Sequence, residues 1–196
     1  MKNSDDSIML ILSSPSGAGK TTISKKIQQK FPNFKISVSH TTRKPRPNEI
    51  EGIDYFFVKE EKFKDLIKKK QFYEHAKIFD NYYGTSIESV KTLINQKYDI
   101  LFDIDWQGTQ QLSSYPELNL IKIFILPPDK KELKKRLIQR NQDKNDVVEN
   151  RLKSFDNDIT HWHDYDYVLI NDNLELCFSQ IEKIIHLNKQ KKININ

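Results

Sequence analysis

Residues 13–22 read Ser-Ser-Pro-Ser-Gly-Ala-Gly-Lys-Thr-Thr and lie between an apolar run and an amphipathic segment. The apolar run, Ile8–Leu12, has the composition of a buried strand, and Ile23 and Ile27 have the spacing of one helix face. A strand, a glycine-containing loop and a helix start form a phosphate cradle, because backbone N–H groups and the helix N-terminus point at one spot. The segment therefore predicts the first strand, loop and helix of an α/β fold.

The loop matches the phosphate-binding consensus G-x-x-x-x-G-K-S/T at Gly19, Lys20 and Thr21. Ser14 stands where the first glycine is expected, and we expect this to adjust the shape of the turn without loss of function. A chance glycine-rich turn is the alternative, which the preceding strand and following helix disfavour. We predict a nucleoside triphosphate site formed by Ser14, Pro15, Ser16, Gly17, Ala18, Gly19, Lys20, Thr21 and Thr22.

Strands and helices alternate along most of the chain, which predicts a mostly parallel sheet covered by helices on both faces. Apolar strands are expected at 8–13, 99–103, 120–126 and 167–170, and helices at 19–31, 86–96, after Asp129, at 145–160 and at 174–188. The section from about 36 to 90 is richer in strands and interrupts this rhythm. It has expected strands at 37–40, 55–58 and 72–79, a helix at 59–70 and a turn at 81–84, and we interpret it as an inserted subdomain.

The 196 residues are enough for one domain with a substantial core. The longest apolar run is too short to span a bilayer, so no membrane association is expected. Cys177 is the only cysteine, which excludes an intramolecular disulfide and favours a cytoplasmic location. The net charge is +5, yet 27 of the 32 basic residues are lysines in scattered runs, so we expect no nucleic-acid partner.

The five arginines fall into two groups, Arg43 with Arg46 and Arg136 with Arg140 and Arg151. Arginine suits positions that need a planar fork of donors, as in phosphate recognition. Chance clustering and local ion pairs remain alternatives to phosphate binding.

Glu74 lies in an otherwise apolar stretch, where an unpaired carboxylate would be costly. A fork of two N–H donors would satisfy it, and the N1–H and exocyclic amine of guanine provide such a fork. An ion pair with Lys77 is the alternative. Tyr55 and Tyr83 offer hydroxyl groups nearby in the sequence.

Several segments, in this order, resemble those of guanylate kinases: residues 37–46, 51–58, 74–76, 81–85 and 103–108. The resemblance spans about residues 8–185 and implies transfer of the γ-phosphoryl group of ATP to GMP, with Mg²⁺ as cofactor. It implies a P-loop NTPase-type parallel sheet flanked by helices, with an inserted β-rich GMP-binding subdomain and a helical lid. The expected division of the single domain, 1–196, is a core (5–35, 86–127 and 165–190), a GMP-binding subdomain (36–85) and a lid (128–160).

The resemblance also implies roles for individual acceptor-site residues. Guanine would be contacted by Ser39 and Glu74, with Thr85 and Asp105 close by. The GMP phosphate would be held by Arg43, Arg46, Tyr55 and Tyr83. Asp103, also placed at the GMP site, would assist Mg²⁺ through water, and Thr21 would ligate the ion. A helix cap is the alternative for both aspartates, and we favour it more for Asp105 than for Asp103.

On the donor side, the resemblance assigns catalysis to Lys20, Arg140 and Arg151, together with Arg43 from the acceptor side. Arg136 would frame the adenosine, and Asn171 lies in the segment that corresponds to the adenine-contacting loop. The GMP phosphate is itself the attacking group, so no general base is required.

Two alternative functions remain: a non-catalytic guanylate-kinase-like interaction module, and a P-loop kinase for another phosphorylated small molecule. The sequence leaves open whether dGMP is a second acceptor and whether the chain forms a homo-oligomer.

Overall fold

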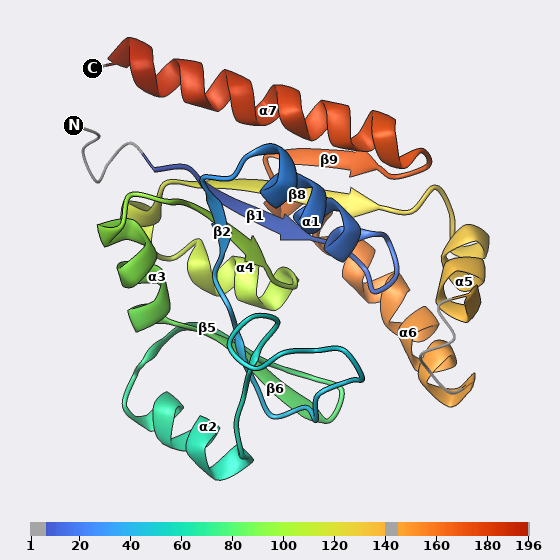
Figure 1. Cartoon of the computed structure of the whole chain (residues 1–196). Helices are drawn as coiled ribbons and strands as arrows, with labels where there is room; N and C mark the ends of the chain where they lie inside the picture. Colours follow the sequence, from blue (N-terminus) through green and yellow to red (C-terminus); the bar gives the residue numbers. More distant parts are fainter. Residues whose placement is uncertain (1–6, 140–144, 196) are drawn as a thin grey trace.

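Residues 7–139 and 145–195 are described by the computed structural model of the chain. Within these residues a five-stranded sheet forms the centre, and all its neighbouring strands run parallel. The order is β2 (Phe34–Ile36), β7 (Asp99–Asp103), β1 (Met9–Ser13), β8 (Leu120–Leu126) and β9 (Tyr167–Ile170). The glycine-rich loop follows the central strand β1 (Figure 1), at the edge where open α/β sheets bind ligands.

Helices cover both faces of this sheet, as predicted. They are α1 (Lys20–Lys30) and α7 (Leu174–Ile195) on one face and α3 (Ile87–Asn95) and α4 (Trp106–Leu112) on the other. The alternation of side chains along β1 accounts for the two layers, because neighbouring residues of a strand point to opposite faces. Leu10 belongs to the buried cluster with Ile27 of α1, whereas Ile11 belongs to the cluster with Val90 of α3. The α/β class expected from the sequence is confirmed.

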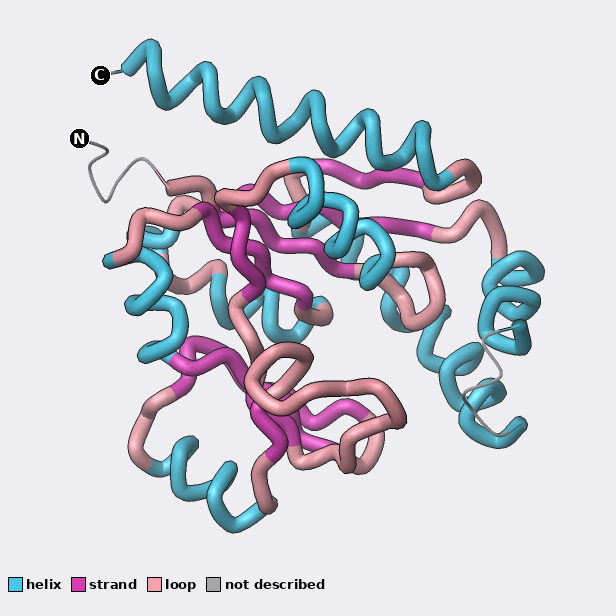
Figure 2. Tube along the Cα trace, viewed as in Figure 1, coloured by secondary structure: helices cyan, strands magenta, loops and turns pink. Residues whose placement is uncertain are grey.

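A second sheet lies below the first in the view of Figure 2. Its order is β4 (Phe56–Phe57), β3 (His40–Thr41), β6 (Asn81–Ser86) and β5 (Phe72–Ile78). Helix α2 (Glu60–Lys68) packs on it through Phe63, whose fully buried ring stacks on Phe72 at 4.7 Å between centroids and on Tyr82 at 5.5 Å. Three aromatic rings thus form the contact between this helix and the second sheet.

Two further helices, α5 (Lys130–Gln139) and α6 (Asn145–Asp158), lie at the carboxyl edge of the central sheet (Figure 1). Leu133 and Leu137 of α5 are buried with Phe155 of α6, so the two helices pack through apolar side chains. Asp129 caps α5, since its Oδ1 accepts a 2.6 Å hydrogen bond from the backbone N–H of Glu132. α6 is followed by the 3₁₀ helix η3 (Ile159–Asp164), where the sequence predicted an α-helix to residue 160. A second 3₁₀ helix, η2 (Pro116–Leu118), precedes β8.

The expected turn at residues 81–84 is wrong, because these residues begin strand β6. β6 pairs antiparallel with β5, with Ala76 opposite Tyr83, and the reversal occurs at Phe79 and Asp80. Phe79 takes the left-handed conformation (φ 53°) that tight turns require. The tyrosines of residues 81–84 have high strand propensity, which outweighs the turn preference of Asn81 and Gly84.

Three other expectations also need correction. Residues 37–39 lie between two strands, β2 and β3, rather than in one strand. Helix α4 was implied only by the capping alternative for Asp105 and had no predicted bounds, and α7 continues to Ile195 beyond the predicted end near residue 188. Both helices depend on packing or capping contacts that the apolar pattern alone does not reveal.

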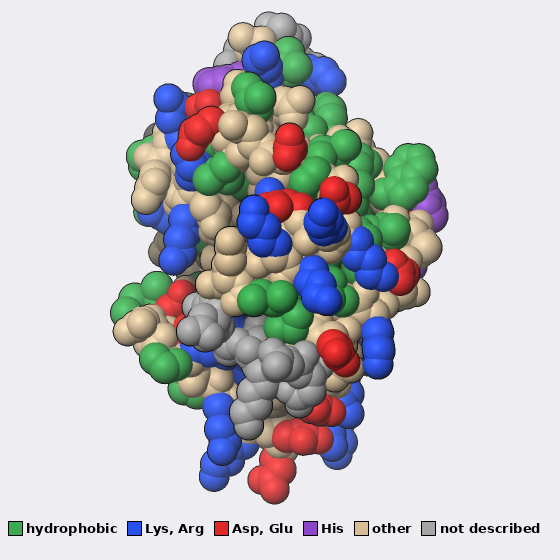
Figure 3. Space-filling model, turned by 90° about the vertical axis from the view of Figure 1, so that its right-hand side faces the viewer, with side chains coloured by type: hydrophobic (Ala, Val, Ile, Leu, Met, Phe, Trp, Pro, Cys, Tyr) green, Lys and Arg blue, Asp and Glu red, His purple; other side chains and the backbone are tan. Residues whose placement is uncertain are grey.

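Basic and acidic side chains are interspersed over the face that carries α5 and α6 (Figure 3). Among the described residues, none of the helices combines the length and apolar content that a bilayer crossing requires.

Candidate active site

The phosphate loop, residues 14–19, is shaped by two glycines in left-handed conformations. Gly17 has φ 97° and Gly19 has φ 105°, and α1 begins directly afterwards at Lys20. Residues other than glycine rarely adopt such backbone angles. Ser14, at the position of the missing glycine, donates a 3.0 Å hydrogen bond from its hydroxyl to the Pro15 carbonyl. A local hydrogen bond therefore accompanies the substitution, and the loop still leads into the helix N-terminus.

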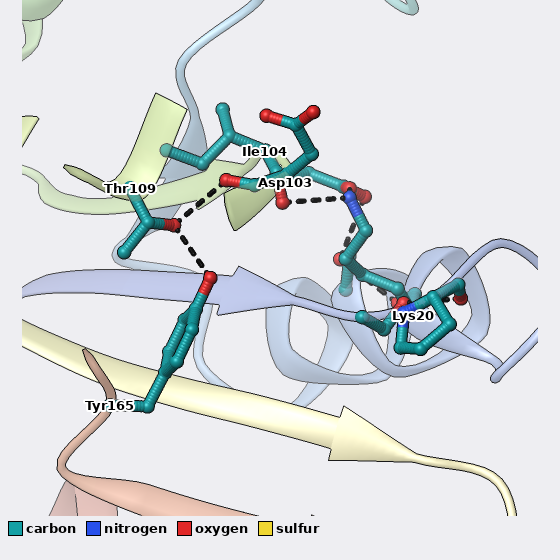
Figure 4. A network of polar contacts seen from close by, with 9 residues as sticks. Lys20, Asp103, Ile104, Thr109 and Tyr165 are labelled. Carbon is teal, nitrogen blue, oxygen red and sulfur yellow. Dashed lines mark hydrogen bonds and ion pairs between the residues drawn. The ribbon is translucent and has the colours of Figure 1, made fainter. Parts of the chain in front are cut away.

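Lys20 is held at the carboxyl end of β7 (Figure 4). Its Nζ donates a 3.2 Å hydrogen bond to the Ile104 carbonyl and forms an ion pair with Asp103. The Ser24 hydroxyl donates a 3.1 Å hydrogen bond to the other oxygen of the Asp103 carboxylate. The predicted phosphate ligand and the predicted magnesium residue are therefore in direct contact, although they lie 83 positions apart in the sequence. Thr21 is an exposed residue of the first turn of α1.

Asn171 and Arg136, both predicted on the adenosine side, meet beside the phosphate loop. The Asn171 side chain donates a 2.8 Å hydrogen bond to the Ala18 carbonyl, and Arg136 donates one of 2.9 Å to the Asn171 carbonyl. Glu132 orients the guanidinium through a 2.9 Å bond to Nε. A cavity of about 380 Å³ opens here, a size suited to a small ligand. It is lined by Gly17, Gly19, Thr22, Arg136, Gln139, Asn171, Asp172 and Leu174.

Arg151 of α6 reaches the phosphate loop. Its guanidinium donates a 2.9 Å hydrogen bond to the Ser16 hydroxyl. Leucines 133 and 137 of α5 pack so closely on Gly17 that an added β-carbon would lie within 2.9 Å of both. The two helices are therefore docked on the loop. Arg140, which was predicted to act beside Arg151, lies outside the described residues.

Glu74 of β5 is 3% exposed. Burial is the main cause that raises the pKa of its carboxyl to about 7; Asp105 contributes to this rise, and Thr85 opposes it. Its Oε2 lies so close to Gly108 that a β-carbon there would be only 2.7 Å away. Among the described residues no ion pair joins Glu74 to Lys77, whose ammonium lies 5.8 Å from the centre of the Tyr82 ring. The alternative ion pair is therefore wrong.

Asp105 caps α4, as its Oδ1 accepts a 3.0 Å hydrogen bond from the Gly108 N–H, so the capping alternative is confirmed. Thr85 is fully buried and lies opposite Glu74 in the sheet. Ser39 precedes β3, and its carbonyl accepts a 2.9 Å bond from the Phe56 N–H.

The two arginines of the acceptor segment share one carboxylate, that of Glu49. One oxygen accepts a 2.7 Å hydrogen bond from the Arg43 guanidinium and the other accepts a 2.8 Å bond from the Arg46 backbone N–H. Arg43 also lies 5.3 Å from the centre of the Tyr55 ring, and that ring is 6.0 Å from the ring of Tyr83. Arg43, Tyr55 and Tyr83 are thus brought together as predicted. Glu49 was not predicted from the sequence.

Tyr55 connects the acceptor segment with the donor side. Burial, with a smaller contribution from the charge of Asp103, raises the pKa of its hydroxyl to about 12. Asp103 is paired with Lys20, so Tyr55 lies within electrostatic reach of the partner of the phosphate-loop lysine.

The family model for guanylate kinase matches residues 7–188. A guanylate kinase of Paramagnetospirillum magneticum is 44% identical over 185 residues, covering 94% of this chain and 86% of the relative. One of Rickettsia bellii is 44% identical, covering 95% and 97%. A crystal structure of guanylate kinase from Anaplasma phagocytophilum has a TM-score of 0.77 and 33% identity, covering 93% of this chain and 86% of that one. With this similarity along nearly its whole length, the chain belongs to the guanylate kinase family.

Proposed function

We propose that this protein transfers the γ-phosphoryl group of ATP to GMP, giving ADP and GDP. The observation that carries the choice of acceptor is the buried carboxyl of Glu74, which is 3% exposed and whose neighbour Lys77 lies over the Tyr82 ring instead of pairing with it. The N1–H and exocyclic amine of guanine would replace its lost hydration with two hydrogen bonds. Adenine lacks this pair of donors, and a site left with an unpaired buried carboxylate should reject it by about 10⁴-fold.

The reaction requires alignment and neutralisation of charge rather than acid–base catalysis. Lys20 would bind the β- and γ-phosphates after exchanging its Asp103 partner for them. Arg151, already at Ser16, would neutralise the transferring group, and Arg43 would hold the GMP phosphate together with Tyr83. Arg46 and Tyr55 complete this phosphate site in our proposal, and Ser39 and Thr85 complete the guanine site.

Magnesium fits the oxygen donors at this place. Thr21 and Asp103 offer a hydroxyl and a carboxylate, and Mg²⁺ in such sites takes its other ligands from phosphates and water. Among the described residues no cluster of three or more His, Cys, Asp or Glu side chains forms a protein-only metal cage. When bound, the ion would neutralise the β- and γ-phosphate oxygens.

The domain division follows from the same proposal. The parallel sheet and its helices form the core, residues 36–85 form the GMP-binding subdomain, and residues 128–160 form the lid. Closure of α5 and α6 over the phosphates would exclude water, which competes with GMP as acceptor.

The test is a coupled ADP-release assay with GMP, dGMP, AMP, CMP and UMP offered separately at equal concentrations. We expect turnover with GMP and none above background with AMP, CMP or UMP. Turnover of AMP equal to that of GMP would contradict the guanine assignment, and absence of turnover with every acceptor would favour a non-catalytic module. The rate with dGMP determines whether it is a second acceptor.

A further inference from the structure

Helix α4 is fastened on one side to strand β5, which carries Glu74. The Gln111 side chain makes two hydrogen bonds to the backbone of His75, accepting from its N–H at 3.1 Å and donating to its carbonyl at 2.9 Å. One turn earlier, Gly108 lies so close to the Glu74 carboxylate that a β-carbon on this glycine would not fit. A shift of α4 would therefore move the group that we assign to guanine recognition.

The first residue of α4, Trp106, contacts the segment that ends α6. Its indole stacks on the His161 imidazole, with 3.6 Å between ring centroids and 7° between planes. The indole also lies near the carboxyl of Asp158, the last residue of α6. Burial raises the pKa of Asp158 to about 6, against the effect of the indole N–H, which lowers it. The indole thus favours the ionised form of this half-buried carboxyl.

The rest of α4 continues the same contact. The Tyr165 hydroxyl donates a 3.0 Å hydrogen bond to the Thr109 hydroxyl (Figure 4), and Gln110 donates one of 3.1 Å to Asp164. Every described turn of α4 therefore touches residues 158–165 on one side, while β5 lies on the other.

α6 extends this connection to the donor site. Arg151 lies seven residues before Asp158, which is two helical turns or about 10 Å along the axis. At that position Arg151 donates its hydrogen bond to Ser16 of the phosphate loop. A continuous series of contacts therefore runs from the phosphate loop through α6, Trp106 and α4 to Glu74.

We propose that Trp106 is a positioning residue whose contacts with His161 and Asp158 couple occupation of the ATP site to occupation of the acceptor site. The proposal rests on the proposed function. These contacts couple the two sites only if ATP and GMP each favour the same arrangement of α4 and α6. The quantity to measure is therefore the coupling free energy between the two nucleotides. Trp106 touches neither substrate in this assignment, and its effect is exerted through α4 and α6.

Isothermal titration calorimetry tests the proposal on the full chain with Mg²⁺. The Kd of a non-hydrolysable ATP analogue is measured with and without saturating GMP, and the reverse titration gives the same factor by linkage. We expect each nucleotide to tighten the other by about 5-fold or more in the unaltered protein. In Trp106→Ala the factor should fall toward one, while the Kd of each nucleotide alone changes by less than about 2-fold.

Trp162→Ala is the matched control, because Trp162 lies beside His161 in η3 and is 54% exposed. This variant should keep the full coupling factor. Trp106→Phe retains a ring for His161 and should recover part of the factor. If Trp106→Ala does not fold, His161→Ala removes the same stack from the other partner and should abolish the factor. An unchanged factor in Trp106→Ala, or a factor of one in the unaltered protein, overturns the proposal. Failure of GMP to bind at all would instead refute the proposed function.

Discussion

The side-chain amide of Asn171 occupies the space that a β-carbon on Gly19 would need, with Nδ2 only 2.4 Å from its ideal position. The same amide holds the Ala18 carbonyl at 2.8 Å, so the loop and the segment after β9 fit together without spare room. Gly19 also has φ 105°. Conformation and space therefore both require glycine at this position.

Gly19→Ala should consequently disrupt the donor site. The left-handed conformation alone costs about 1–2 kcal/mol for a residue with a side chain, and displacement of Asn171 adds to it. We expect a large rise in the KM for ATP and a lower melting temperature. Gly52→Ala is the control, because Gly52 also has a positive φ (73°) but a β-carbon there would meet its nearest neighbour at 3.6 Å. Equal effects of both changes on the KM for ATP would contradict the explanation.

The second prediction concerns Glu74 and guanine binding. Only the ionised carboxylate accepts both guanine donors, and its pKa is about 7. The KM for GMP should therefore fall as the pH is raised from 6 to 8, whereas the KM for ATP should change little. Glu74→Gln should raise the KM for GMP at pH 8 and remove most of this pH dependence, measured by initial rates at saturating ATP. A rise in the KM for ATP with GMP unaffected would mean that the two sites are reversed.

The same shift predicts how stability depends on pH. The folded pKa of Glu74, about 7, lies above the reference value of 4.5, so the unfolded state loses its proton first. The stability associated with the protonated group is present below pH 4.5 and is lost as the pH rises through 7. The free energy of unfolding of Glu74→Gln minus that of the unaltered protein should therefore be larger at pH 8 than at pH 5. The increase should be at most about 3 kcal/mol. Urea unfolding at the two pH values measures this difference, and a difference of zero would argue against the raised pKa.

The sequence predicted the structure best where the residues of a single segment determine its secondary structure. The strand–loop–helix around Lys20, the buried strands and the alternation of elements all have local patterns, and these were confirmed. Strand β6 was not predicted, and helix α4 was implied only by the capping alternative for Asp105, because contacts with neighbouring residues stabilise both elements. The tyrosines of β6 pair with β5, and α4 begins with an Asp105 cap directly after a strand.

One partner within the site was also not predicted from the sequence. The carboxylate of Glu49 contacts both Arg43 and Arg46, yet only the backbone path of the loop brings it there. An acid three positions after Arg46 was a weak signal that could have suggested it. Individual site roles stay predictions, while the structure shows which side chains lie close enough to share them.

Lys20 provides a test of catalysis that separates it from acceptor binding. Lys20→Met removes the charge and keeps most of the side-chain length. We expect kcat to fall by about 10²–10³-fold or more, with the Kd of GMP changed little. Lys26→Met is the matched control, because Lys26 lies on the same helix but pairs with the exposed Glu175, at 2.7 Å. A loss of GMP binding in Lys20→Met would show that the change disturbs the acceptor site as well as phosphoryl transfer.

The last prediction concerns a buried charge at the far end of the sheet. Asp99 is fully buried, and its two oxygens have separate partners: the Ile8 N–H at 2.9 Å and the Lys189 ammonium at 3.1 Å. Lys189 belongs to α7 and lies 5.5 Å from the centre of the Phe34 ring. Its removal would leave a buried carboxylate without its counter-charge, which costs much more than the loss of a surface ion pair.

Lys189→Met should therefore lower the free energy of unfolding by about 2 kcal/mol, a value reduced from that of a fully buried pair because Lys189 is 33% exposed. Lys183→Met, an exposed position on the same helix, should change it by less than about 0.5 kcal/mol. Urea unfolding measures both. A double variant with Asp99→Asn should lose less than the sum of the two single changes, because each removes the same interaction. Additive losses would show that the two charges do not stabilise one another, and that α7 is held to the sheet by its apolar face alone.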